Sequence, residues 1–404
     1  MKSRLYVARV IPQDGEGECN FSQIDDGLNI GLLPYIKITG NNQIYPVKFI
    51  NQLTRHLKER GMDELIMDIS SRLSKGVEEA ERELELIDRL NESLKKQVVR
   101  DVSFSYGSVI SHAEAYKRLD EICKKHLHPD NSCDLSSFEI ITKDEYRKAI
   151  EEAKKETIKL SEKAKELGLK IGPENMPCID YAEIKGNNRK QKDFEKRLRF
   201  GYGYFPDLNN PGWIGCNPNG DLKYLIEDDM FLTLDTEHLN FSLIVSKTNN
   251  FSLGEKSPFL SASPDENIEN IIKNIPQQIR IVHLGAGFDL FYDTTLDNRK
   301  VTQIASHFPY LFPGDFDKLS EKGKKNYSSY VNKDSMSLTE EKRKQFMVQC
   351  IKALKENIRG NDAIVVMEFE VGEINNNGIW QNLYSGNLWK EFFKISKENL
   401  ESLL

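Results

Sequence analysis

Four acidic or imidazole side chains end four successive apolar runs between residues 170 and 368. Glu174 ends Lys-Ile-Gly-Pro-Glu, Asp235 ends Phe-Leu-Thr-Leu-Asp, His283 ends Arg-Ile-Val-His, and Glu368 ends Ile-Val-Val-Met-Glu. One carboxylate at a strand end is usually a helix cap or a solvated loop residue, but four consecutive cases need a shared cause. Crowded carboxylates need a cation to offset their repulsion. Oxygen donors with one imidazole suit Mn²⁺, Co²⁺, Mg²⁺ or Zn²⁺, so these residues predict a metal site.

Repeated alternation of short apolar runs and long amphipathic helices predicts the elements that would position these side chains. Such alternation is typical of βα units and a parallel sheet. The strands are expected at 35–39, 64–69, 101–106, 125–128, 169–174, 230–235, 280–284 and 363–369. Eight parallel strands close a barrel whose carboxyl ends meet at one mouth. We therefore predict the α/β class and a (β/α)8 barrel.

Helix boundaries are marked by capping signals. Thr142 followed by Glu145 forms a capping-box pattern, and Gly168 supplies the left-handed residue that ends the same helix. Ser337 followed by Glu340 opens another helix in the same way.

Two regions depart from the alternation, which otherwise predicts one barrel domain over 34–404. Residues 1–33 form an N-terminal extension, within which 4–11 could be a strand of its own. A long insertion at about 182–229 separates the fifth and sixth strands and carries a basic run at 185–199. A loop this long is uncommon unless it covers a site. The basic run is either a solvated helix or a phosphate clamp.

The composition favours a folded, cytoplasmic protein. Hydrophobic residues make up 39% and charged residues 29%, which excludes a disordered chain, and the net charge of −7 argues against nucleic-acid binding through bulk charge. No apolar stretch is long enough to cross a membrane, and the N-terminus has no signal-peptide core. Six scattered cysteines are typical of reduced thiols.

The ordered strand motifs between about Asp101 and Glu370 resemble the xylose-isomerase-like TIM-barrel superfamily, which includes sugar isomerases, sugar epimerases and the endonuclease IV family. The resemblance is carried by Glu-Asn-Met-Pro at 174–177, Asp-x-x-His at 235–238, the histidine at 283 and the glutamate at 368.

The epimerase branch implies a single divalent metal held by Glu174, Asp235, His283 and Glu368. It also implies that Glu174 and Glu368 are catalytic and trade protons with opposite faces of a small sugar, polyol or sugar phosphate. His238 and Asn175 would then bind this substrate, which is the expected partner. The stretch after His283 lacks the arginine usual at that place.

The endonuclease IV branch implies an alternative, a metal-dependent phosphodiesterase acting on DNA. His128, His238 and His307 would be additional metal ligands in that case. A serine and Ala305 stand where two further ligands of that family are expected. Nucleic acid is thus the less favoured partner, and no membrane partner is expected. An inactive barrel retained as a binding subunit is a third alternative, and a homo-oligomer is left open.

Overall fold

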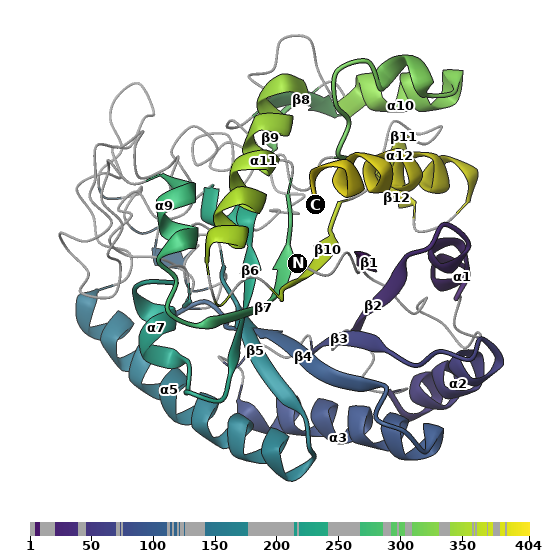
Figure 1. Ribbon diagram of the computed structural model, residues 1–404. Helices are drawn as coiled ribbons and strands as arrows, with labels where there is room; N and C mark the ends of the chain where they lie inside the picture. The colour runs from purple at the N-terminus through teal and green to yellow at the C-terminus, as the bar shows by residue number, and fades with distance from the viewer. Residues whose placement is uncertain are drawn as a thin grey trace.

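The computed structural model describes eight parallel strands that close into one barrel. The described residues are 5–8, 21–38, 46–69, 76–110, 142–176, 218–240, 267–285, 292–296, 299–303, 309–330, 340–357, 362–369, 371–374, 380–383 and 386–404, with a few single residues between them. Around the barrel the strand order is β1-β10-β7-β6-β5-β4-β3-β2, with helices outside it (Figure 1). The predicted (β/α)8 fold is confirmed.

The barrel strands are short and mostly buried. They are β1 (Leu5–Ala8), β2 (Leu33–Ile38), β3 (Leu65–Ile69), β4 (Val99–Ser105), β5 (Lys170–Glu174), β6 (Phe231–Asp235), β7 (Gln278–His283) and β10 (Ile364–Met367). Two antiparallel hairpins, β8 (Tyr292–Leu296) with β9 (Arg299–Gln303) and β11 (Val371–Ile374) with β12 (Trp380–Leu383), lie outside the barrel sheet.

Helices follow most of the strands. They are α1 (Ser22–Asn29), α2 (Pro46–Glu59), α3 (Val77–Leu94), α5 (Lys143–Glu166), α7 (Asp221–Leu225), α9 (Ile268–Lys273), α10 (Glu321–Tyr330), α11 (Glu340–Glu356) and α12 (Asn387–Leu403), with a short 3-10 helix at Phe316–Lys318. Among the residues described, no helix has the length and apolar content that a membrane crossing requires.

One predicted strand is wrong, and another segment takes its place. Strand β4 pairs directly with β5 through Asp101 and Lys170, so no barrel strand lies at 125–128. Lys125 has helical backbone, and 126–128 lie outside the described residues. Four residues are too few for the apolar pattern to separate a strand from a helix. The strand considered within 4–11 exists as β1, so part of 1–33 belongs to the barrel.

The capping signals of α5 are confirmed. Thr142 Oγ1 accepts a hydrogen bond from the Glu145 amide at 3.2 Å, and Glu145 Oε2 accepts one from the Thr142 amide at 2.9 Å. Gly168 follows the helix with φ of +67°, a conformation that L side chains rarely adopt. Hydrogen bonds from Arg118 and from the Thr142 amide lower the pKa of Glu145 to about 2. The helix start is therefore held at neutral pH.

A half-buried acid on α5 makes stability depend on pH. Burial, and then the nearby charges of Glu152 and Glu78, raise the pKa of Glu156 from 4.5 to about 7. The unfolded chain loses this proton near pH 4.5 but the folded chain keeps it to about pH 7, so stability falls between these values. We expect Glu156→Gln to raise the free energy of unfolding by about 1 kcal/mol at pH 8, allowing for solvent screening, and not at pH 4. Urea unfolding at both pH values, with Glu166→Gln as control, measures the difference; equal gains at both would contradict it.

Side chains fill the barrel interior. A cluster made only of strand residues (Tyr35, Ile66, Phe231, Ile281, Ile364 and Val366) is separate from the larger core that joins strands to helices. A Cβ atom on Gly172 would lie 2.3 Å from the Phe231 ring, so the glycine in β5 makes room for that ring. The barrel is a packed core and not a pore, as expected for this fold.

Candidate metal centre

The four predicted metal ligands lie together at the carboxyl-end mouth of the barrel. Glu174, Asp235 and His283 are the last residues of β5, β6 and β7, and Glu368 directly follows β10. Because these strands are parallel and adjacent, their ends face the same mouth. One donor atom from each residue lies within 4.8 Å of all the others, and all four side chains are buried.

The imidazole of His283 lies between the carboxylates. Its Nδ1 atom is 2.7 Å from Glu368 Oε2, 3.2 Å from Glu174 Oε1 and 4.0 Å from Asp235 Oδ2. Its Nε2 atom is 3.1 Å from the Tyr35 hydroxyl, and the two rings meet edge to face with centroids 5.2 Å apart. A partner on one ring nitrogen fixes which nitrogen faces the metal. Tyr35 therefore orients Nδ1 toward the three carboxylates.

The charges in the centre are strongly coupled. Burial alone would raise the pKa of Glu174, but the charge of His283 and its hydrogen bond outweigh burial and lower it to about 2. Burial alone would lower the pKa of His283, but Glu368 and Glu174 raise it well above its usual value. One positive charge is thus needed among these acids. A divalent cation fits the same donor set and would release the imidazole proton on binding.

The Asn175 side chain joins the end of β5 to the end of β6. Its Oδ1 accepts from the Asp235 amide at 2.6 Å and its Nδ2 donates to the Asp235 carbonyl at 3.0 Å, in full burial. These two strands share only the register pair Glu174–Thr233, so the amide side chain continues the ladder beyond it. The amide of Asn175 therefore holds the Asp235 backbone, and the substrate contact expected of Asn175 stays a prediction.

Loss of this amide should affect both stability and metal affinity. Asn175→Ala leaves two buried backbone groups of Asp235 unsatisfied, so we expect the free energy of unfolding to fall by roughly 2–3 kcal/mol. Asn91, whose buried amide bonds Val98 and Val99 at the other end of the barrel, gives a matched control. Urea unfolding should show a loss in both alanine variants, while calorimetric metal titration should show weaker binding only for Asn175→Ala. Equal metal affinity in both would contradict the positioning role.

His238 lies at the edge of the centre. Its Nδ1 atom is 2.9 Å from the Asn175 carbonyl oxygen, 3.4 Å from Asp235 Oδ2 and 3.6 Å from Glu174 Oε1. Its backbone amide donates to Asp235 Oδ1 at 2.9 Å. The side chain is 21% exposed, against 8% or less for the four central residues. His238 is thus the more exposed neighbour of the four buried donors.

Some residues near the centre were missed by the sequence reasoning, and others lie outside the described part of the chain. Glu237 is buried, and a Cβ atom on Gly285 would lie 1.7 Å from its Cγ, so that glycine permits the close approach. The regular position of Tyr35 within an apolar strand gave no separate signal. His128 and His307 lie outside the described residues, and their role as further ligands stays a prediction.

Comparison with known proteins gives matches among solved structures only. No protein-family model and no curated protein sequence matches the chain. D-psicose 3-epimerase in the presence of D-fructose is similar at 10% identity and a TM-score of 0.44, over 99% of this chain and 97% of that one. D-psicose 3-epimerase with D-tagatose from Clostridium cellulolyticum H10 is similar at 11% identity and a TM-score of 0.43, over 99% of this chain and 97% of that one. The IolI protein with a binding zinc atom is similar at 13% identity and a TM-score of 0.40, over 99% of each chain.

Proposed function

We propose that the chain is a divalent-metal-dependent sugar isomerase or epimerase. Its reaction would be proton transfer at a carbon beside a carbonyl or hydroxyl group of a small sugar, polyol or sugar phosphate. The observation that carries this proposal is the set of three carboxylates and one imidazole whose donor atoms lie within 4.8 Å at the mouth where barrel enzymes bind substrate.

The donor set supports a resident cation held by Glu174, Asp235, His283 and Glu368. When bound, such a cation stabilises negative charge on the oxygen atoms next to a carbon that loses its proton. Because the four donor side chains are buried, little water reaches the centre, and this strengthens electrostatic interactions there.

Two of the carboxylates would move protons. Glu174 comes from β5 and Glu368 from the end of β10, and β6 and β7 separate these strands in the barrel order. The two side chains therefore flank the centre from different sides. One carboxylate would remove the proton from a substrate carbon, and the other would return a proton to the opposite face.

His238 would bind a substrate oxygen. The Asn175 carbonyl oxygen accepts a hydrogen bond only from a protonated Nδ1, which leaves Nε2 as an acceptor in the neutral ring. A substrate hydroxyl could then donate to Nε2. The partial exposure of this side chain supports a contact at the opening of the site.

Metal analysis combined with isotope exchange tests the proposal. Mass spectrometry of protein purified without added metal or chelator should find about one manganese, cobalt, magnesium or zinc ion per chain. A panel of ketoses, polyols and sugar phosphates in deuterium oxide should show enzyme-dependent deuterium at one carbon. Two or three zinc ions together with cleavage of abasic DNA would instead support the phosphodiesterase. No metal uptake and no exchange on any substrate would reject the enzyme.

A further inference from the structure

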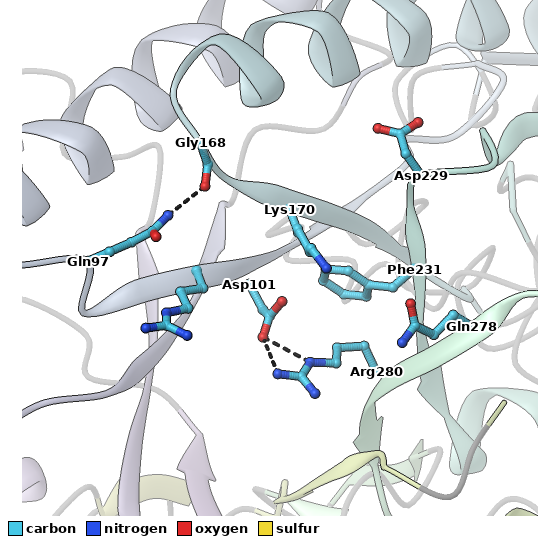
Figure 2. A pocket seen from close by; sticks show the side chains of 9 residues that line it. Gln97, Asp101, Gly168, Lys170, Asp229, Phe231, Gln278 and Arg280 are labelled. Carbon is cyan, nitrogen blue, oxygen red and sulfur yellow. Dashed lines mark hydrogen bonds and ion pairs between the residues drawn. The ribbon is translucent and has the colours of Figure 1, made fainter.

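A cavity lies at the amino-terminal mouth of the barrel, at the other end of the strands from the candidate metal centre. Its volume is about 280 Å³. It is lined by Gln97, Arg100, Asp101, Gly168, Lys170, Asp229, Phe231, Gln278 and Arg280, most of which Figure 2 shows around one space. Lys170 begins the strand that Glu174 ends, so the cavity and the metal centre lie at opposite ends of β5.

Two irregularities in strand pairing place the charged residues of this cavity. Between β3 and β4 the register passes from Leu65–Val99 to Met67–Val102, so β4 contains one extra residue in the stretch that holds Arg100 and Asp101.

The second irregularity lies between β6 and β7. There the register passes from Leu232–Ile279 to Thr233–Ile281, which makes Arg280 the extra residue. Bulges at barrel rims typically redirect a side chain, often beside a functional site.

The acids of the cavity are already paired with cations. Asp101 is buried, and its Oδ2 atom accepts from both Nε and a terminal nitrogen of Arg280 at 2.9 Å (Figure 2). This pair fixes the guanidinium plane and leaves its other N–H groups as donors. Asp229 is 3.2 Å from the Lys165 ammonium. Neither acid is therefore a counter-ion for the remaining cations.

Arg100 and Lys170 supply the remaining positive charge. Both are exposed at the rim of the cavity, and neither has an acidic partner among the residues that the structure describes. A fixed guanidinium in the same cavity as two such cations provides several charged donors around one small space. Guanidinium groups match the oxygen geometry of phosphate, and an ammonium group adds a compact charge.

We propose that this cavity binds a small phosphate-bearing anion, with Arg100, Lys170 and Arg280 as its donors and Asp101 as the residue that orients Arg280. The volume lies just below the roughly 300–1,000 Å³ of typical small-molecule sites, which favours a phosphorylated molecule of few carbons.

An adjoining cavity of about 320 Å³ shares Arg100, Asp101 and Arg280 but is bordered by Asp63 and Glu64. Asp63 is paired with Lys96, and neither Asp63 nor Glu64 lines the cavity of about 280 Å³. The small volume of that cavity therefore argues for a small anion and against a nucleic-acid backbone.

Calorimetric titration with inorganic phosphate at low ionic strength tests the proposal. Arg100→Gln/Lys170→Gln removes two positive charges at the cavity, and Arg55→Gln/Lys58→Gln removes two from exposed positions on α2. We expect phosphate to bind roughly tenfold or more weakly to the first double variant, and unchanged to the second. Thermal unfolding should be near normal for both, because all four side chains are on the surface.

Three results would overturn the proposal. Wild-type protein could give no phosphate binding, or both double variants could lose affinity equally, which would show an effect of net charge alone. Loss of binding in Asp235→Asn would place the phosphate at the metal centre. Retained binding in Asp235→Asn supports the separate cavity, and it does so whether or not the proposed isomerase activity is found.

Discussion

Substitution of either Glu174 or Glu368 by glutamine should abolish inversion of a substrate carbon while leaving part of the proton exchange intact. An amide keeps the size of the side chain but cannot take up a proton, and loss of such a group costs roughly 10²–10⁴-fold in rate. The carboxylate that remains can still remove a proton from one face and return it to that face. Each variant should therefore incorporate deuterium into one epimer and not into the other.

The two variants serve as controls for each other. Deuterium incorporation into each purified epimer, followed by NMR at saturating metal, should show opposite preferences in Glu174→Gln and Glu368→Gln. Saturating metal is needed because both side chains also belong to the proposed ligand set. If both variants lost exchange with both epimers to the same extent, the glutamates would act only as ligands, and the assignment of two proton-transfer faces would be wrong.

Removal of metal by a chelator should lower the free energy of unfolding by about 4 kcal/mol. The reference is protein in a solution whose free metal concentration is about 1,000 times the dissociation constant of the site. The reason is that the donor set exists only in the folded barrel. Asp235→Asn keeps the shape of the side chain and an oxygen acceptor for the His238 amide, yet it removes one ligand charge. Urea unfolding with and without metal should show most of the gain lost in this variant.

An aspartate just before the start of β6, at the other end of this strand from Asp235, gives the control for this measurement. Asp228→Asn, at an exposed position just before β6, should keep the full gain from metal. Because the proton on His283 competes with a cation, the gain should shrink as the pH falls. A gain that is the same in Asp235→Asn, or that grows at low pH, would contradict a metal held by these four residues.

The candidate metal centre was predictable because it depends on strand ends. Once the sequence indicates parallel strands, the residues that end them must meet, and Glu174, Asp235, His283 and Glu368 do so. The partner of His283 was not predictable in this way, because the contact with Tyr35 depends on which residues of β2 face the barrel interior. The link from the Asn175 amide to Asp235 was not predictable either, because it depends on how short the β5–β6 pairing is.

The limits of the sequence are clearest in very short strands and in register shifts. Strand β1 has four residues and the predicted strand at 125–128 also has four, so neither pattern could be separated from a helical turn. The cavity at the amino-terminal mouth depends on one extra residue in each of β4 and β7. A one-residue shift is decided by both paired strands together. In the sequence, Arg100 and Arg280 indicate only charged residues near the starts of strands.

The seam between β1 and β10 affects the order in which the chain can fold during synthesis. Leu5 pairs with Val365, so β1 waits for β10, which is synthesised after the other barrel strands. Until residues 364–367 emerge from the ribosome, β1 and β7 are open edges of an unclosed sheet. Such edges invite pairing with other chains, and contacts between distant residues form slowly. A polypeptide that stops before this seam forms is therefore prone to aggregate. Pairing of β10 with β1 and β7 removes the two open edges of the barrel sheet.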